Sequence, residues 1–524
     1  MELEQEQKFE KIQSFLRLNI NNVFTELGNN SDIVKREFSL YKNSTIKAAF
    51  FYVDGLVNEE VVEKTILTPM IDRSYKLEST SEIKGEALIE TIYEQLISTP
   101  SVAIVNTINE GIDGILSGDT FLLVDTCDQG FILSTKGWAS RGIDAPETEP
   151  VIRGPRDGFS ENIRTNTSLV RRRIRDTNFN IDALKIGKRS RTDVGVGYIE
   201  GIVNEGLVKE VKDRLNRIDI DAVLESGYIE ELISDAPLSP FVTIQSTERP
   251  DKVAASLYEG RVAIFVDNTP FVLLAPAHFW QFLQASDDYY NNYLMGTFFR
   301  LIRYSAFIIS LTLPSIYVML ASFHQEMIPT PLAVAIAAGR EAIPFPVLLE
   351  AIIMEIAFEL MREAGLRMPK PIGQAVSIVG SLIIGQAAVE AGLVSPIMVI
   401  VVATTGIAAF SIPHYDASYS IRLLRFPILL ASGTLGLLGF SAVITLLALH
   451  AFSLRSFGEA YLSPIIPMNP TDQKDTILRI PWWGNKKRPE SARGDTTRVG
   501  EHQKPSPSGN ETTEKNEESQ ENDK

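Results

Sequence analysis

Residues 301 to 452 limit the possible folds of this chain most, because they hold several apolar runs of bilayer length between two polar regions. A membrane helix needs about 20 apolar residues to cross a hydrocarbon core of about 30 Å. The overall composition hides this region, since 44% hydrophobic and 22% charged residues describe an ordinary soluble protein. We therefore expect a polar head, a helical membrane region and a polar tail.

The charge and cysteine content exclude some classes of protein. A formal net charge of -16 argues against a nucleic-acid partner, which requires a basic surface. The single cysteine, Cys127, rules out an intramolecular disulfide framework and a cysteine-based zinc cluster. The first 19 residues carry glutamates and no apolar core of signal length, so we expect a cytoplasmic head. We also expect no cofactor and no metal.

The head contains an internal repeat. The segment 52–59, YVDGLVNE, returns at 198–205 as YIEGIVNE, and the strand-like pair in 120–133 returns in the same order in 262–274. Two matched blocks in matched order indicate tandem units. Each block reads as strand, helix and hairpin, so we predict an α/β head of two tandem similar subdomains.

The expected organisation has six parts along the chain. They are a leading helical segment (1–45), a first α/β subdomain (46–140), an Arg-rich linker (141–192), a second α/β subdomain (193–290), an α-helical multispan membrane domain (300–455) and a largely disordered polar tail (470–524).

The repeated acids of the head, Asp54, Glu200, Asp125 and Asp267, could indicate carboxylate catalysis or metal binding. An acid at a strand end more often closes a turn or caps a helix, and we favour that interpretation. The head shows no nucleophile-base set, P-loop or dinucleotide motif nearby. We therefore predict that the chain is not an enzyme.

The linker is rich in arginine and is the most basic part of the head. It could bind an anionic ligand or lipid headgroups, but salt bridges to carboxylates of this acidic protein or of a neighbouring subunit are favoured. The candidates for subunit contact are Arg153, Arg156, Arg171, Arg172, Arg173 and Arg175.

One apolar stretch of the membrane region, 344–365, carries four acids, Glu350, Glu355, Glu359 and Glu363, of which the last three recur every fourth residue. This spacing places those three on one helical stripe. Carboxylates facing lipid are costly, so the stripe must face protein, water or the membrane surface. It could form an ion path, or it could be salt-bridged within a bundle or lie at the interface.

A second stretch, 372–391, is a cleaner span with one small, weakly polar face formed by Gln374, Ser377, Ser381, Gly385 and Ala388. Such a face can line a pore in an oligomer or let helices pack closely, and the residues alone favour packing. The other expected spans are 301–323, 393–412 and 427–452, with a re-entrant or interfacial piece at 328–340. The expected number of crossings is four to six.

Several long motifs carry a family resemblance. They include RGPRDGF (153–159), RRRIRD (171–176), DVGVGYIEGIVN (193–204), the run from 360 to 396 and RLLRFP (422–427). In this order they resemble the A subunits of GerA-type spore germination receptors, over roughly residues 40 to 470. A related subfamily, encoded in SpoVA operons, shares much of the pattern.

The resemblance implies a multi-pass protein of the spore inner membrane that acts with B and C subunits and membrane lipid. It further implies a homo-oligomeric ring that forms a ligand-gated cation channel and triggers germination, which shifts the interpretation of 372–391 from packing to pore lining. The alternatives are a SpoVA-operon relative and a non-conducting scaffold subunit.

Overall fold

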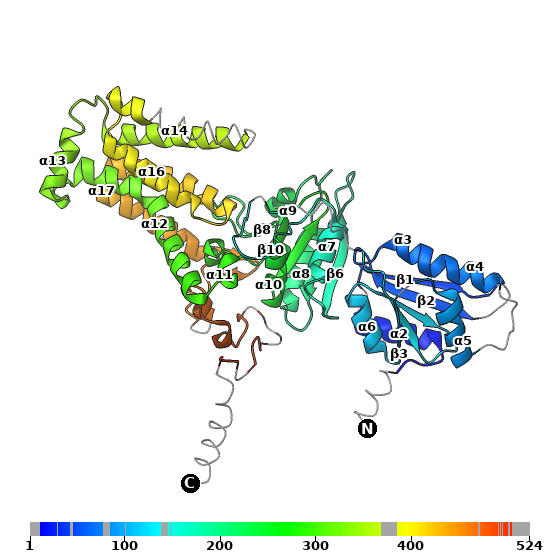
Figure 1. Ribbon diagram of the computed structural model, residues 1–524. Helices are drawn as coiled ribbons and strands as arrows, with labels where there is room; N and C mark the ends of the chain where they lie inside the picture. The colour runs from blue at the N-terminus through cyan, green and yellow to red at the C-terminus, as the bar shows by residue number, and fades with distance from the viewer. Residues whose placement is uncertain are drawn as a thin grey trace, which may run out of the picture.

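The computed structural model describes residues 11–28, 30–41, 46–76, 84–99, 101–137, 145–146, 148–367, 385–469, 472–490, 492, 494, 496–500 and 503–505. These residues form two sheet-containing units, which together make up the head, and a helical region (Figure 1). The second unit lies between the first unit and the helices.

The first unit contains a five-stranded sheet in which every neighbouring pair is antiparallel, with the order β1-β2-β4-β5-β3. Its elements are α2 (Leu16–Leu27), β1 (Ile33–Ser39), β2 (Lys47–Val53), α3 (Glu59–Val61), η1 (Val62–Leu67), α4 (Thr68–Lys76), α5 (Glu86–Thr91), η2 (Ile92–Leu96), β3 (Val102–Val105), α6 (Ile108–Leu116), β4 (Thr120–Val124) and β5 (Gly130–Leu133).

Strand β2 explains why this sheet is covered on both faces. Its residues are apolar throughout after Lys47, and successive side chains of a strand point to opposite faces. Phe50 joins a core with η1, α5 and η2, whereas Phe51 joins a core with α2 and α6. The sheet is therefore the middle of three layers.

The second unit repeats the same strand arrangement, β6-β7-β9-β10-β8, again antiparallel throughout. Its elements are α7 (Ile163–Arg171), β6 (Phe179–Ile186), β7 (Thr192–Ile199), α8 (Glu205–Asn216), α9 (Ser226–Ile233), β8 (Gln245–Thr247), α10 (Pro250–Tyr258), β9 (Val262–Val266) and β10 (Val272–Ala275). The order of helices and strands along the chain is the same in both units when the continuous helical stretches α3–η1–α4 and α5–η2 of the first unit are each taken as one helix.

The unit boundaries differ from those expected from the sequence. Strand β1 lies in 1–45, which was expected to be helical, and β6 lies with α7 in 141–192, which was expected to be a linker. Both strands are edge strands that pair along their full length with the strand opening the repeat. Edge strands need fewer apolar residues, so they are less conspicuous in the sequence.

Two of the repeated acids occupy equivalent structural positions. Asp125 accepts a hydrogen bond from the backbone N–H of Leu16 (3.1 Å), and Asp267 accepts one from the backbone N–H of Ile163 (3.1 Å). Each carboxylate therefore satisfies the free N–H at the first residue of the helix that opens its unit, α2 or α7.

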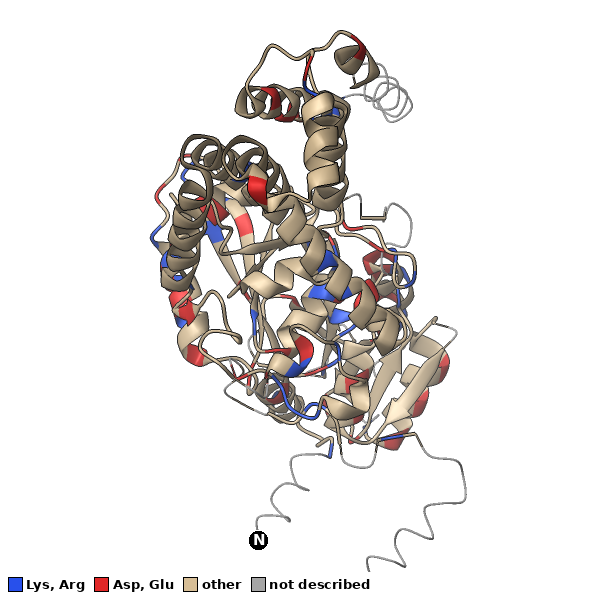
Figure 2. Cartoon of the chain, turned by 90° about the vertical axis from the view of Figure 1, so that its left-hand side faces the viewer, with Lys and Arg blue, Asp and Glu red and all other residues tan. Residues whose placement is uncertain are grey.

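The helical region follows η3 (Phe279–Leu283) and α11 (Asp287–Tyr290). It contains α12 (Tyr293–Phe323), η4 (Gln325–Met327), α13 (Thr330–Ala338), α14 (Val347–Arg367), α16 (Pro396–Phe410) and α17 (Tyr415–Ser453). In the described part of the chain, two helices, α12 and α17, are long and apolar enough to cross a membrane. The helices nearest the viewer in Figure 2 carry few charged residues.

Helix α17 has two arms that run in opposite directions. Gly436, at φ 60° and ψ -137°, interrupts the helix and lies against Phe323 at the end of α12. His414 contacts Gln245, and His450 contacts Ser239. Gln245 and Ser239 are close in the sequence of the head, so even an extended chain would place them at most about 22 Å apart. A straight helix would separate the two histidines by about 54 Å, so the chain reverses at Gly436. The span expected at 427–452 therefore covers parts of both arms.

The C-terminal segment returns to the head. It contains β11 (Arg455–Ser456), β12 (Glu459–Ala460), η5 (Asp472–Asp475) and η6 (Trp482–Gly484). Arg488 donates to the carbonyl of Tyr258 (2.9 Å), and Arg498 pairs with Glu259 (3.2 Å). Residues 472–490 are thus packed, because Arg488 finds an acceptor on α10 and Arg479 donates to the carbonyls of Tyr289 and Asn291. This segment lies on the same side of the helical region as the head.

Candidate functional site: two anchors and a charged ladder

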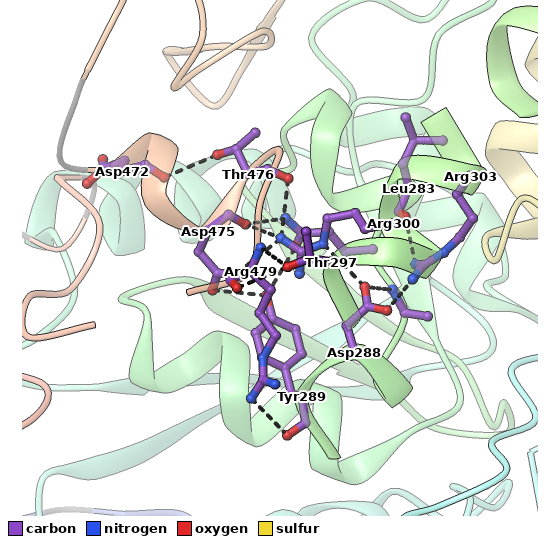
Figure 3. A network of polar contacts seen from close by, with 12 residues as sticks. Leu283, Asp288, Tyr289, Thr297, Arg300, Arg303, Asp472, Asp475, Thr476 and Arg479 are labelled. Atoms are coloured by element: carbon purple, nitrogen blue, oxygen red, sulfur yellow. Dashed lines mark hydrogen bonds and ion pairs between the residues drawn. The ribbon is translucent and has the colours of Figure 1, made fainter. Parts of the chain in front are cut away.

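The first helix, α12, is fixed to the head by a buried set of charges that we call the α12 anchor (Figure 3). Its four members are Asp288, Arg300, Arg303 and Asp475. Arg300 is fully buried and donates to Asp288 (3.4 Å) and Asp475 (3.1 Å). Arg303 pairs with the same Asp288 and donates to the carbonyl of Leu283 (2.8 Å). One helix face is therefore joined to α11 and to the C-terminal segment at once.

The C-terminal part of this anchor contains Asp475. The hydroxyl of Tyr289 donates a hydrogen bond to the Asp475 carboxylate (3.1 Å), and this carboxylate also accepts a hydrogen bond from Arg300. Burial raises the pKa of Asp475, and the charge of Arg300 opposes that rise. The sequence around Arg300 and Arg303 gives no sign of their partners.

A second set of contacts, the α17 anchor, joins the start of α17 to the head through Glu149, Gln245, Lys252 and His414. Lys252 lies 2.7 Å from Glu149 and 2.5 Å from the Nε2 atom of His414, which is also 3.0 Å from Gln245. Next to this set, Ser246 donates to Asp416 (2.6 Å). His414 is buried and holds the helix to α10 and β8.

Burial and charge set the protonation of the α17 anchor. Burial, with the nearby ammonium of Lys252, lowers the pKa of His414 to about 3. Burial alone would raise the pKa of Glu149, but Lys252 and His414 together lower it to about 2. At neutral pH the imidazole is therefore uncharged and the carboxylate is ionised.

Three of the four predicted acids of α14 pair with arginines of other elements, and we call these pairs the charged ladder. Glu355 and Arg425 are both buried, with their atoms 2.5 Å apart. Glu359 pairs with Arg422, and Glu350 lies 3.4 Å from Arg340 and accepts from Ser395. The fourth acid, Glu363, pairs with Arg367 of its own helix at the surface (2.7 Å). The ladder thus cross-links α14 to the first arm of α17.

Arg425 also replaces a backbone hydrogen bond that is missing in α12. Pro314 has no N–H, so the carbonyl four residues earlier, that of Ser310, loses its helical partner. Arg425 donates its Nε–H to this carbonyl (2.9 Å) while its Nη1 binds Glu355. One guanidinium therefore joins three helices, α12, α14 and α17.

The predicted small-residue face lies mostly outside the described residues. Gln374, Ser377 and Ser381 fall in 368–384, which the structure does not describe. Gly385 is buried, and a Cβ added there would meet Val399 of α16 at 3.6 Å. Ala388 is half-buried and packs against the core of the helical region.

The six predicted arginines fall into two groups. Arg171 is fully buried between the two units and donates twice to Asp32 (3.0 Å each), and Arg172 and Arg173 both pair with Asp157. The side chains of the other three are exposed: Arg153, Arg156 and Arg175.

Sequence reasoning missed the ladder's cations and both anchors. Arg422 and Arg425 are three residues apart on a helix, a spacing that can match two acids four residues apart on a neighbouring helix. That signal was present in the RLLRFP motif. The anchor residues carry no such signal, because Asp288 and Asp475 are separated by 187 positions (475 minus 288).

Comparisons with known proteins cover most of the chain. A family described as Bacillus/Clostridium GerA spore germination protein matches residues 21–491. Spore germination protein KA of Bacillus subtilis (strain 168) is 43% identical over 497 residues, which are 95% of this chain and 90% of that protein. The uncharacterized membrane protein YfkQ of the same organism is 44% identical over 474 residues, 90% of each chain.

One solved structure is also similar. The N-terminal domain of the A subunit of the Bacillus megaterium spore germinant receptor GerK3 is 36% identical, with a TM-score of 0.40. The match covers 51% of this chain and 97% of that domain.

Proposed function

Because the chain belongs to the GerA family of spore germination proteins, we propose that it is the A subunit of a receptor that responds to nutrient germinants in bacterial spores. In this role it works with B and C subunits in the spore inner membrane. The head and the C-terminal segment, which carries Lys486, Lys487 and Arg488, contact each other, as expected if both are cytoplasmic.

The proposed activity is that of a cation channel formed by a homo-oligomeric ring. The ladder supports this assignment indirectly: the acids at 350, 355 and 359 are neutralised by arginines, so they do not offer an open row of carboxylates. The small-faced stretch 372–391, with Gln374, Ser377 and Ser381, is then the better candidate for the conduit.

The observation that carries the proposal is the position of the first arm of α17. Its first residues are bound to the head by His414 and Asp416, and two to three turns later its arginines bind α14. A movement of the second unit would therefore be passed to α14 and α12 through one rigid helix. This is the arrangement that a receptor needs if its head controls a membrane pore.

The test measures potassium flux from liposomes that contain the purified full chain. The Ser377→Leu and Ser381→Leu variants should each reduce flux strongly, because a leucine narrows and dries a hydrated path. Ser441→Leu is the matched control, since Ser441 is exposed on the second arm of α17. Unchanged flux in both pore variants would remove the pore assignment.

A second candidate function is a non-conducting scaffold. It is favoured by the two units with equal element order, which we propose are tandem subdomains, and by the exposed arginines 153, 156 and 175. Reversing these three charges to glutamate should abolish binding of B and C subunits, measured by co-purification. If the chain is a scaffold, wild-type liposomes show no flux at all. A SpoVA-operon relative would be recognised by the genes beside its own.

A further inference from the structure

A chamber lies in the head where the C-terminal segment covers the second unit. Its larger lobe has a volume of about 530 Å³ and its smaller lobe about 150 Å³. The lobes share six lining residues, which lie in the turn after α10, in and just after η3, in α11 and in the C-terminal segment: Glu259, Arg261, Gln281, Gln284, Tyr289 and Arg498. The larger lobe alone is of the size that holds a small organic molecule.

The charge of the larger lobe is predominantly acidic. Five carboxylates line it, those of Glu259, Glu459, Asp472, Asp475 and Glu490, against the three permanent cations Arg261, Lys487 and Arg498. A fourth cation, Arg300, binds Asp475 from outside the lobe (3.1 Å). A polar cavity with excess carboxylate attracts cations and repels anions. An anionic ligand is therefore disfavoured.

The two arginines are already engaged in holding the walls. Arg261 is buried and donates to the carbonyls of Leu274 and Pro276 and to Gln245. Arg498 pairs with Glu259 (3.2 Å). Both guanidiniums keep their charge, and the ion pair between Arg498 and Glu259 leaves Glu459, Asp472 and Glu490 facing Arg261 and Lys487.

Two carboxylates of the lobe lack a permanent cationic partner among the described residues. Glu459 contacts the imidazole of His278 (3.2 Å), and Glu490 accepts from the amide of Asn469. The indole N–H of Trp280 is used by the carbonyl of Leu462 (3.1 Å), which leaves its ring to line the chamber. Carboxylates beside an aromatic ring are typical of sites for ammonium groups.

The carboxylates are spread around the chamber rather than gathered at one point. In the described part of the chain, no group of three His, Cys, Asp or Glu side chains is placed to hold a metal ion. A metal ion needs several oxygen ligands at about 2.0 to 2.6 Å. A longer cation with more than one charged group matches separated carboxylates better.

We propose that this chamber binds a small organic cation that carries primary ammonium groups, held by Glu459 and Glu490 and packed against Trp280. The same lobe is lined by Asp475, which binds Arg300 of the α12 anchor, and by Tyr289, which donates to Asp475. A bound cation therefore lies next to the residues that fix the first membrane helix to the head. The proposal concerns binding and does not depend on channel activity.

The test is isothermal titration calorimetry of the purified full chain in detergent with 1,4-diaminobutane. We expect saturable binding that weakens with added salt, and no binding of 1,4-butanediol, which has the same length without charge. Each lost charge-assisted hydrogen bond should weaken binding about tenfold, so Glu459→Gln and Glu490→Gln should each have that effect. Lys487→Ala should strengthen binding by about threefold, because it removes a like charge from the wall.

The control is the Glu326→Gln, Glu341→Gln double variant, which changes the net charge by two at exposed positions far from the chamber. It should bind the diamine as the wild type does. Equal binding of the diamine and the diol, equal binding by all carboxylate variants, or no saturable binding would each overturn the proposal. The Lys487→Ala variant covers the case in which a carboxylate variant fails to fold, because it must act in the opposite direction.

Discussion

The charged ladder and the α17 anchor both bury charges, but they differ in how many partners each buried carboxylate has. In the ladder, Glu355 has one cationic partner, Arg425, and both side chains are almost completely removed from solvent. In the α17 anchor, Glu149 is shared between Lys252, the hydroxyl of Thr247 and the imidazole of His414. A charge with one partner depends on it entirely, whereas a shared charge keeps part of its stabilisation when one partner is removed.

The largest effect is expected from breaking the ladder at Arg425. Replacing it by Met leaves Glu355 buried without a cation and the Ser310 carbonyl without a donor, which should cost about 3–5 kcal/mol of unfolding free energy. Denaturant unfolding of the purified protein in detergent measures this loss. The double variant Glu355→Leu, Arg425→Met should regain most of it, and a double variant as unstable as the single one would show that the two charges are not coupled.

The features that could be predicted from the sequence also differ between these regions. The acid spacing in α14 gave the stripe, and the repeat of YVDGLVNE gave both sheets, because periodicity within one segment is visible in one chain. The arginines that pair with Glu359 and Glu355 lie 63 and 70 residues away, and no pattern within one segment links them. The reversal at Gly436 was missed for a related reason: a glycine among apolar residues reads equally well as close helix packing.

A smaller loss is expected from Lys252→Met in the α17 anchor. Glu149 keeps the Thr247 hydroxyl and the imidazole of His414, so the cost should be about 2–3 kcal/mol and below that of Arg425→Met. The same denaturant titration measures it. If Lys252→Met cost more than Arg425→Met, the contrast between shared and single partners would be wrong. Lys64→Met, at an exposed pair of the first unit, is the control.

The α17 anchor should also respond to pH, which the ladder's arginines do not. His414 has a pKa of about 3 in the folded chain and about 6.5 when unfolded, so only the unfolded chain takes up the proton between these values. Stability is therefore complete above pH 6.5 and falls as the pH drops, by about 2 kcal/mol at pH 5. Glu149 does not contribute to the loss at pH 5, because the stability that comes from its lowered pKa is lost only below its ordinary pKa of 4.5.

The measurement compares unfolding free energies at pH 7 and pH 5 for the wild type and His414→Gln. Glutamine can still contact Gln245 but does not titrate, so the variant should lose about 2 kcal/mol less than the wild type over this range. Equal pH dependence in the two proteins would mean that the imidazole is accessible to protons in the folded chain.

The smallest effect is expected at the surface end of the acidic stripe. Glu363 pairs with Arg367 four residues away on the same helix, in a geometry similar to the buried pairs, but both side chains are largely exposed. Water already solvates these charges, so Glu363→Gln should change the unfolding free energy by less than about 0.5 kcal/mol. Glu363 and Glu355 belong to one helix and one stripe, and each has an arginine partner. A loss at Glu363 close to that at Arg425 would therefore show that burial is not what separates the ladder from an ordinary surface pair.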